Sequence, residues 1–294
     1  MSDPQITILI TAFREAATIG KAVEAVLGQV DGQQAEIIVI CPDDETAQAA
    51  SEHPVQIIRD PQQGKPAALN LGLAAARGAL VVFTDGDVYV GPDALTHLLA
   101  PFADPATGAV SGHPISLEPR DTMLGYWSHL LTDAGAHAER IKRDAAEQFF
   151  VCSGYLYAIR AGLIVHIPED ALAEDAVVSH LIGQQGYRTR YASDAYVYVQ
   201  YPKTYRDWLK QKVRSAGGYA QPVIAESPLR MRSFWHEAVA GSWRSLRYAR
   251  NLRELLWTLA QFAARIHMWL LIFWRVRVRR VPLTKLWQRV ESTK

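Results

Sequence analysis

The chain has 294 residues, 49% of them hydrophobic and 21% charged, so it is long enough for a full globular core and is not a disordered protein. Its net charge of +1 hides an uneven distribution. Residues 230–294 hold 14 Lys and Arg against 3 Asp and Glu, a net of +11, whereas residues 1–229 hold 17 against 27, a net of −10.

Cys41 and Cys152 have no second Cys or His at ligand spacing, which excludes a disulfide framework and a zinc site and favours a reducing compartment. Met1–Pro4 lacks a basic segment followed by an apolar one, so we expect no signal peptide.

Alternating strands and helices are predicted for the first hundred residues. Apolar runs rich in β-branched side chains predict buried strands at residues 6–10, 36–40, 55–58 and 79–83. Helical spacing of apolar residues follows the first strand and recurs from Leu69 to Ala76, where Gly78 is expected to end the helix. This alternation predicts an α/β fold with a mostly parallel sheet that is covered on both faces and binds ligands beyond the carboxyl ends of its strands. Later strands are expected at 108–117 and 149–160, with a helical segment at 120–147.

Three polar segments follow the predicted strands, at residues 11–15, 43–46 and 85–87, and should meet at one sheet edge. In the last segment, Asp85 and Asp87 flank Gly86. Two carboxylates so spaced can hold a hard divalent cation that also binds diphosphate oxygens, although the same pattern occurs in plain acidic turns. Lys65 could reach a diphosphate or lie in solvent. The chain has neither a Gly-x-Gly-x-x-Gly motif after its first strand nor a Gly-Lys-Ser/Thr loop, which disfavours the usual dinucleotide fold and a P-loop.

Together these motifs resemble the inverting glycosyltransferases of family 2, a group with a GT-A fold that includes the chitin, hyaluronan and cellulose synthases. The similarity covers roughly residues 5–220. It rests on five ordered motifs: Ile6–Glu15, Gly64–Asn70, Asp85–Asp87, Ser153–Gly154 before Arg160, and Ala173–Asp175.

The resemblance implies a nucleotide-sugar donor, with a uridine diphosphate sugar as the first expectation, and Mg²⁺ or Mn²⁺ as the cofactor. The metal would bridge Asp87 and the diphosphate, while Asp85 would lie near the ribose or the metal. The other residues implied in the nucleotide pocket are Thr11, Ala12, Glu15 and Lys65, and those implied near the acceptor are Gly154 and Glu174.

Two positions depart from the family pattern. Cys41 and Pro42 precede the Asp43–Asp44 pair, which leaves open which aspartate meets the base, with Asp43 counted among the pocket residues. Gln211 and Arg214 match the Gln-x-x-Arg part of the processive synthases' motif and could meet the diphosphate, but Ser215 replaces the tryptophan that follows it. Processive and single addition therefore both stay open.

Asp175 is the candidate catalytic base. A single displacement at the anomeric carbon needs a base for the acceptor hydroxyl and a cation for the leaving diphosphate. The alternative is that Asp175 caps the helix that its segment begins. Because no second carboxylate is needed for a covalent intermediate, the sequence predicts inversion.

The basic end of the chain carries six tryptophans interleaved with arginines, a pattern that favours a bilayer interface over nucleic acid. Residues 255–274 are mostly apolar and as a helix would span about 30 Å, but Arg265 near the centre would cost about 2.5 kcal/mol or more. We therefore expect this segment and residues 234–248 to lie in the interface, with Arg275–Arg280 on cytoplasmic headgroups. Transmembrane insertion, or packing on the catalytic domain or a second subunit, are the alternatives.

The sequence thus predicts a catalytic domain over residues 1–220 and a basic, Trp-rich helical tail over residues 221–294. The expected protein is a glycosyltransferase on the cytoplasmic face of the membrane, acting on a lipid, a lipid-linked glycan or a polysaccharide, with no nucleic-acid partner. The alternatives are a non-catalytic partner subunit that binds nucleotide or membrane, and a sugar-nucleotide nucleotidyltransferase. The latter would need a Gly- and Arg-rich loop where Ala12–Ala16 stands.

Overall fold

A single mixed sheet forms the centre of the computed structural model, which describes residues 4–30, 34–218, 221–229 and 241–278. Its strands are β1 (Ile6–Thr11), β2 (Ala35–Cys41), β3 (Gln56–Arg59), β4 (Leu80–Asp85), β5 (Val88–Val90), β6 (Thr107–Ser116), β7 (Leu156–Arg160) and β8 (Arg188–Val199). They lie in the order β3-β2-β1-β4-β7-β6-β8-β5. The pairs β3–β2, β2–β1, β1–β4 and β6–β8 are parallel, and the other three are antiparallel.

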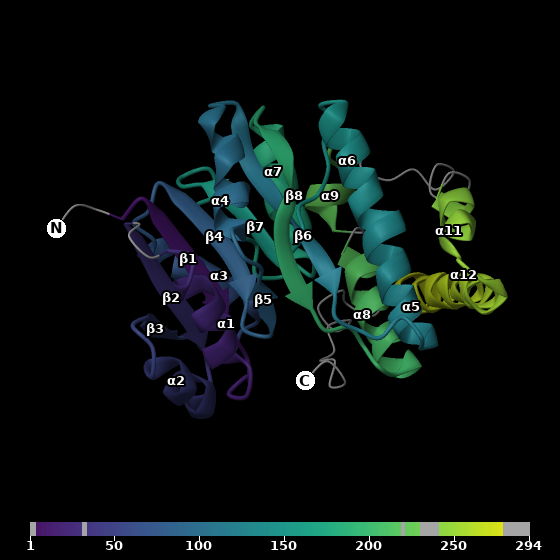
Figure 1. Ribbon diagram of the computed structural model, residues 1–294. Coiled ribbons are helices and arrows are strands. Elements are labelled where there is room, and N and C mark those ends of the chain that lie inside the picture. Colours follow the sequence, from purple (N-terminus) through teal and green to yellow (C-terminus); the bar gives the residue numbers. More distant parts are fainter. Residues whose placement is uncertain (1–3, 31–33, 219–220, 230–240, 279–294) are drawn as a thin grey trace.

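Helices cover both faces of this sheet, with a separate pair at the side opposite to β3 (Figure 1). The described α-helices are α1 (Ile19–Leu27), α2 (Asp44–Ser51), α3 (Lys65–Ala75), α4 (Ala94–Leu99), α5 (Met123–His129), α6 (Ala138–Ala145), α7 (Glu174–Gln184), α8 (Tyr205–Gly218), α9 (Pro222–Ala225), α11 (Ser242–Tyr248) and α12 (Leu252–Phe273). A π-helical segment, Leu130–His137, joins α5 to α6. A 3-10 turn, Ala100–Ala103, follows α4, and a second π-helical segment, Trp274–Val278, follows α12.

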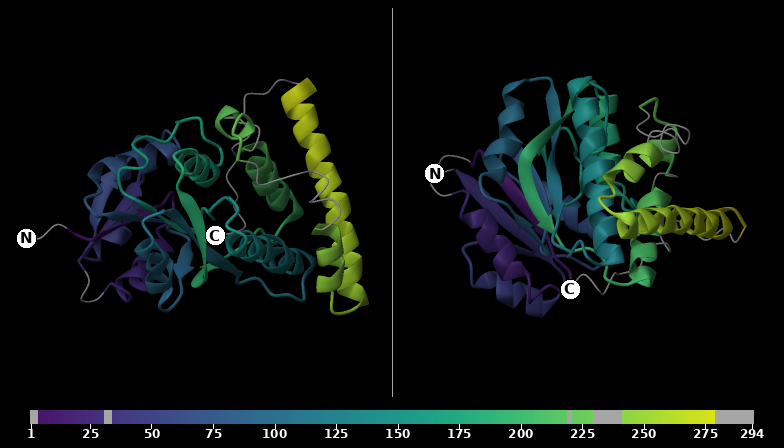
Figure 2. Two further views of the ribbon diagram at one scale, coloured as in Figure 1. Left: turned by 90° about the horizontal axis from the view of Figure 1, so that it is seen from above. Right: turned by 45° about the vertical axis from the view of Figure 1, so that its right-hand side comes forward.

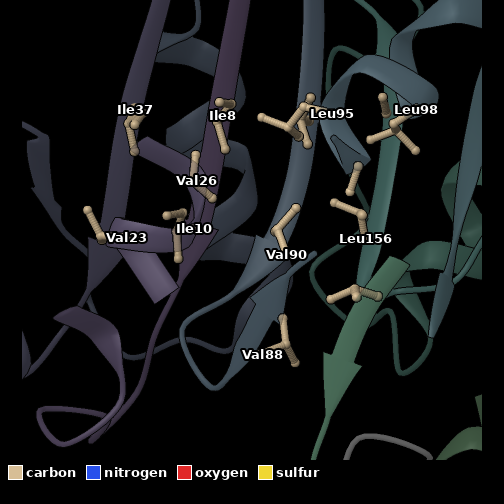
Figure 3. Close-up of a cluster of buried hydrophobic side chains, with 14 of the residues drawn as sticks. Ile8, Ile10, Val23, Val26, Ile37, Val88, Val90, Leu95, Leu98 and Leu156 are labelled. Carbon is tan, nitrogen blue, oxygen red and sulfur yellow. The ribbon is translucent and has the colours of Figure 1, made fainter. Parts of the chain in front are cut away.

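The core has one layer on each face of the sheet because alternate strand residues point in opposite directions. On one face, Ile8 and Ile10 pack with residues of α1 and α4, as Figure 3 shows. On the other face, Leu9 packs with residues of α3 and α7. Because the strand side chains are buried on both faces of the sheet, the strand sequences are continuous apolar runs instead of alternating apolar and polar residues.

The predicted strands of the first hundred residues are all present, and so is the helical segment at 120–147. The prediction for 149–160 was wrong over its first half, because β7 begins only at Leu156. Ahead of it, the backbone N–H groups of Cys152 and Ser153 donate to the hydroxyls of Ser179 and Ser111 instead of to a neighbouring strand. The sequence-based expectation also lacked β5 and β8, which are paired with each other.

Gly78 does not end α3 as predicted. The helix ends at Ala75, and the Ala76 N–H bonds to the Gly72 carbonyl. A Cβ atom on Gly78 would lie 2.4 Å from the backbone nitrogen of Thr7. Glycine is needed there because the chain passes directly against β1, not because a helix needs a left-handed cap.

The long helix α12 lies along α5 and α8 at the far side of the molecule from the N-terminus (Figure 2). Its N-terminal half turns polar side chains inward: Glu254, Thr258 and Gln261 are buried. Its outer face is apolar and exposed, through Leu252, Leu256, Leu259, Ile266, Trp269, Leu270 and Phe273. Among the described residues, α12 is the one helix long and apolar enough to cross a bilayer. The predicted domain boundary at residue 220 stays a prediction, and the calls on residues 234–240 and 279–294 lie outside the described residues.

A buried polar clamp fastens α12 to the catalytic part of the chain. The Arg120 guanidinium donates to both carboxylate oxygens of Glu254, at 2.9 and 3.0 Å, and to the Tyr248 hydroxyl at 2.6 Å. Tyr126 and Thr258 share a hydroxyl hydrogen bond of 2.7 Å, and the Trp127 indole donates to the Trp257 carbonyl at 2.7 Å. These contacts fix the position of α12 relative to the sheet.

We expect Glu254→Ala to lower the free energy of unfolding by about 2 kcal/mol, because it removes two charge-assisted hydrogen bonds whose carboxylate partner is shielded from water. Urea unfolding followed by tryptophan fluorescence measures this change. Arg188→Ala is the matched control: its ion pair with Glu147 is solvent-exposed, so its loss should cost no more than about 0.5 kcal/mol. Equal losses in the two variants would contradict the role of the clamp.

Candidate functional site

The carboxyl ends of β1 and β4 carry the first part of the site. Parallel pairing places Thr11 opposite Asp85, and the Thr11 hydroxyl donates to Asp85 Oδ1 at 2.9 Å. The Gly86 N–H donates to the Thr11 carbonyl at 2.9 Å. A Cβ atom on Gly86 would lie 2.6 Å from Glu15 Oε2 and 2.8 Å from Ala12 Cβ, so only glycine allows these segments to approach so closely.

Asp43 lies against the same loop. Its carboxylate accepts from the Arg14 N–H at 2.8 Å and from the Thr46 N–H and hydroxyl at 3.0 and 2.6 Å. Burial would raise the pKa of Asp43, but the hydrogen bonds from Thr46 and Arg14 outweigh it and lower that pKa. Asp44 instead points to solvent, where it pairs with Arg59 at 2.6 Å. Only Asp43 of this pair therefore contacts the loop that carries Glu15.

Lys65 links the strand end to α7. It follows Gly64, which has a φ of 103°, and begins α3. Its ammonium lies 2.7 Å from Asp85 Oδ1 and 2.9 Å from Glu174 Oε1. Burial would lower the pKa of Lys65, but the two carboxylates overcome this and hold it well above its ordinary range. Burial likewise opposes ionisation of Glu174, but Lys65 lowers its pKa, so both groups stay charged.

Asp175 is held beside this ion pair by the loop ahead of β7. The Gly154 N–H donates to Asp175 Oδ2 at 2.9 Å, and the Ala176 N–H donates to Oδ1 at 2.9 Å. Burial and the neighbouring Glu174 charge raise the pKa of Asp175 to about 6. The N-cap residue of α7 is Ala173, so the cap interpretation of Asp175 was wrong. Asp175 is thus ionised at neutral pH and takes up a proton in mild acid.

The helix α8 supplies the third side of the site. Gln211 is buried, and its Nε2 donates to the Tyr155 hydroxyl at 3.3 Å. Arg214, one turn later, is close enough to influence the titration of both Tyr155 and Glu174. The structure therefore brings α8 to the loop that carries Gly154.

The donor set at this edge consists of hard oxygen ligands. Asp85 and Asp87 are both half-buried, and Asp85 Oδ1 already accepts from Thr11 and Lys65. No group of three or more His, Cys, Asp and Glu able to hold a metal ion occurs in the part of the chain that the structure describes. Two carboxylates fit a divalent cation that takes its remaining ligands from a diphosphate and water.

Most of the sequence-predicted site residues therefore lie around one edge of the sheet. Thr11, Ala12 and Glu15 flank the strand ends, while Lys65, Asp85, Gly154, Glu174, Asp175, Gln211 and Arg214 connect through direct contacts or neighbouring charges. Sequence reasoning gave no role to Tyr155, whose only signal is that it follows Gly154. Thr46 lies within the predicted polar segment 43–46, but its hydrogen bonds to Asp43 and to the Glu15 N–H could not be predicted.

Comparison with known proteins identifies the family. A family model described as "Glycosyltransferase like family 2" matches residues 4–218. The chain therefore belongs to this family of glycosyltransferases, and its fold is GT-A. It is 29% identical over 232 residues to a poly-beta-1,6-N-acetyl-D-glucosamine synthase of Staphylococcus aureus, an alignment that covers 75% of this chain and 56% of that protein. The chain thus spans just over half the length of this curated relative.

Solved structures support the fold. A mannosyltransferase of Pyrobaculum calidifontis, solved with GDP-mannose and Mn²⁺, has a TM-score of 0.62 and 23% identity, with 98% of this chain and 84% of that one covered. A glucosyl-3-phosphoglycerate synthase of Mycobacterium tuberculosis, solved with Mn²⁺, UDP and phosphoglyceric acid, has a TM-score of 0.52 and 21% identity, covering 74% and 76%. At these identities the similarity concerns the fold alone.

Proposed function

We propose that the protein transfers a sugar from a nucleotide-sugar donor to an acceptor hydroxyl, with inversion at the anomeric carbon. The observation that carries this proposal is the close arrangement of two different chemistries. The Lys65 ammonium lies between two carboxylates and beside Asp175, whose pKa is raised and whose carboxylate accepts from the Gly154 N–H. The ammonium can stabilise a leaving diphosphate, and the Asp175 carboxylate can act as a base.

On the donor side, Thr11, Ala12, Glu15 and Asp43 line the nucleoside pocket, and Lys65, Gln211 and Arg214 bind the diphosphate. Lys65 stands at the N-terminus of α3, whose free N–H groups add to the positive potential. Asp87 and Asp85 would hold Mg²⁺ or Mn²⁺. The bound cation would neutralise the charge that develops on the leaving group. UDP-sugars are the first donors to test, and GDP-mannose is the second, because the solved relatives carry these nucleotides.

On the acceptor side, Asp175 removes the proton from the attacking hydroxyl. The Gly154 N–H orients its carboxylate, and the nearby Glu174 charge makes it more basic than a solvated aspartate. Of the two carboxylates that pair with Lys65, Glu174 is the one on the acceptor side of the site. Since this mechanism uses one carboxylate as a base and none as a nucleophile, the product has the opposite anomeric configuration to the donor.

The outer face of α12 provides the membrane contact in this proposal. Seven exposed apolar side chains face outward, and Arg253 and Arg247 lie over the rings of Trp257 and Trp243 at 4.8 Å. Because α12 packs along α5 and α8, it lies in the interface of an anionic, cytoplasmic-side leaflet instead of crossing it. The acceptor is then a lipid, a lipid-linked glycan or a growing polysaccharide near that surface.

Asp175→Asn should lower kcat by about 10²- to 10⁴-fold, because an amide cannot accept the proton. The variant should still bind donor, since its carbonyl oxygen can accept from Gly154.

For the native enzyme, kcat/KM should fall as the pH drops below about 6, where Asp175 becomes protonated, and level off above it. Steady-state rates across pH measure both effects. Asp170→Asn, which changes an exposed carboxylate of the same segment, is the control. Native-like turnover by Asp175→Asn would remove Asp175 from the base role.

A Leu259→Glu, Ile266→Glu double variant should bind vesicles of phosphatidylglycerol and phosphatidylcholine at least about tenfold more weakly, because it places two charges on the apolar face. Co-sedimentation measures this binding. Ile141→Glu, which changes an exposed apolar residue on α6, should bind as the native chain does. Unchanged binding by the double variant would exclude α12 as the docking surface.

A further inference from the structure

Tyr155 lies between the donor side and the acceptor side of the site. It directly follows Gly154, whose N–H holds Asp175, and its own carbonyl accepts from the Thr84 hydroxyl at 2.9 Å. Thr84 precedes Asp85 at the end of β4. The Tyr155 backbone is thus fixed to the strand that carries the proposed metal ligands. Its ring packs edge-on against Tyr201, with centroids 6.0 Å apart.

The hydrogen bonds of the Tyr155 phenol determine where its proton points. Gln211 Nε2 donates to the phenol oxygen at 3.3 Å. A phenol oxygen has two acceptor positions and one proton. The hydrogen bond from Gln211 occupies an acceptor position of this oxygen, so the Tyr155 proton can be donated to another partner.

The charges around Tyr155 indicate what that partner is. Gln211 contacts the phenol directly, the Tyr155 carbonyl is bonded to Thr84 beside Asp85, and the charges of Arg214, Asp87, Asp85 and Lys65 act on the phenol. These are the groups assigned above to the diphosphate and its cation. Burial, the largest influence, raises the pKa of Tyr155 to about 12. The phenol stays protonated throughout the neutral range, so it can act as a hydrogen-bond donor and not as a base.

We infer that the Tyr155 hydroxyl donates a hydrogen bond to a β-phosphate oxygen of the departing nucleoside diphosphate. This inference rests on the proposed function. It assigns to Tyr155 a contact that strengthens as negative charge collects on the leaving group, since hydrogen bonds to a charged acceptor are stronger than those to a neutral one. Tyr201 is a positioning residue in this arrangement, because its ring packs against Tyr155 without touching the phosphate. Gln211 donates one amide N–H to the phenol and keeps its second N–H for the diphosphate.

The test compares ligands that differ only in the β-phosphate. Binding of UDP and of UMP in the presence of Mn²⁺ is measured by calorimetry for the native chain and for Tyr155→Phe, with GDP and GMP as a second pair. Tyr155→Phe should weaken binding of the diphosphate about tenfold or more and leave binding of the monophosphate unchanged. Where a donor turns over, kcat should fall by more than the donor KM rises.

Tyr157→Phe is the matched control. Tyr157 is equally aromatic and is buried against Phe83, with ring centroids 4.5 Å apart, and its hydroxyl has no hydrogen-bond partner within the described ranges. Its removal should leave both affinities unchanged. Thermal unfolding of all three proteins checks that the phenylalanine variants keep the fold, which is expected because both retain the ring.

Four results would overturn the inference. Unchanged diphosphate binding by Tyr155→Phe would show that the hydroxyl does not reach the phosphate. Equal weakening of the diphosphate and the monophosphate, or an equal effect of Tyr157→Phe, would indicate general loosening of the pocket. If the native chain bound neither UDP nor GDP, the proposed function would fail and this inference with it. If the native chain binds and Tyr155→Phe binds equally well, this inference alone fails.

Discussion

The Lys65 ammonium, held between Asp85 and Glu174, is the interaction on which the site depends. It connects the start of α3, the end of β4 and the start of α7, three elements far apart in the sequence. All three side chains are partly buried, so pairing with this cation offsets the cost of removing each carboxylate from water. The same cation also sets the chemistry next to it. Burial and the Glu174 charge raise the pKa of Asp175 to about 6, and Lys65 lowers it in opposition to them. A diphosphate bound to Lys65 would neutralise part of the charge that lowers the pKa of Asp175. The proposed base would therefore become stronger as the donor binds.

The same use of buried polar contacts fixes the position of α12. An amphipathic helix on a globular protein normally turns its apolar side to the core. The N-terminal half of α12 does the reverse, because α5 and the loop before it offer Arg120, Tyr126 and the Trp127 indole as partners. Further along, Met268 and Ile272 pack with Leu172 and Val213, so the helix is attached at both ends. Its apolar outer face is then left for another apolar phase, and the distance between that face and the catalytic edge is set by the fold.

The sequence predicted the sheet edge well because continuous apolar runs mark strands buried on both faces, and the carboxyl ends of parallel strands align. Thr11 and Asp85 therefore meet as expected. The strand β8 was missed because its polar and apolar residues alternate irregularly. The Lys65–Glu174 contact and the inward polar side of α12 result from tertiary packing, which leaves no periodic signal. Gly78 shows the limit of local rules: its position suggested a helix cap, and its actual role is to let the chain pass against β1.

The most direct test of the account is release of nucleoside diphosphate from a panel of UDP-, GDP- and dTDP-sugars. The native chain would be assayed with anionic vesicles and crude lipid and glycan acceptors, in Mn²⁺ or in excess chelator. The account predicts release from one class of donor, dependent on the metal and on an acceptor. Binding of a nucleotide without turnover of any donor under these conditions would contradict it, and would favour a non-catalytic partner subunit with the same fold.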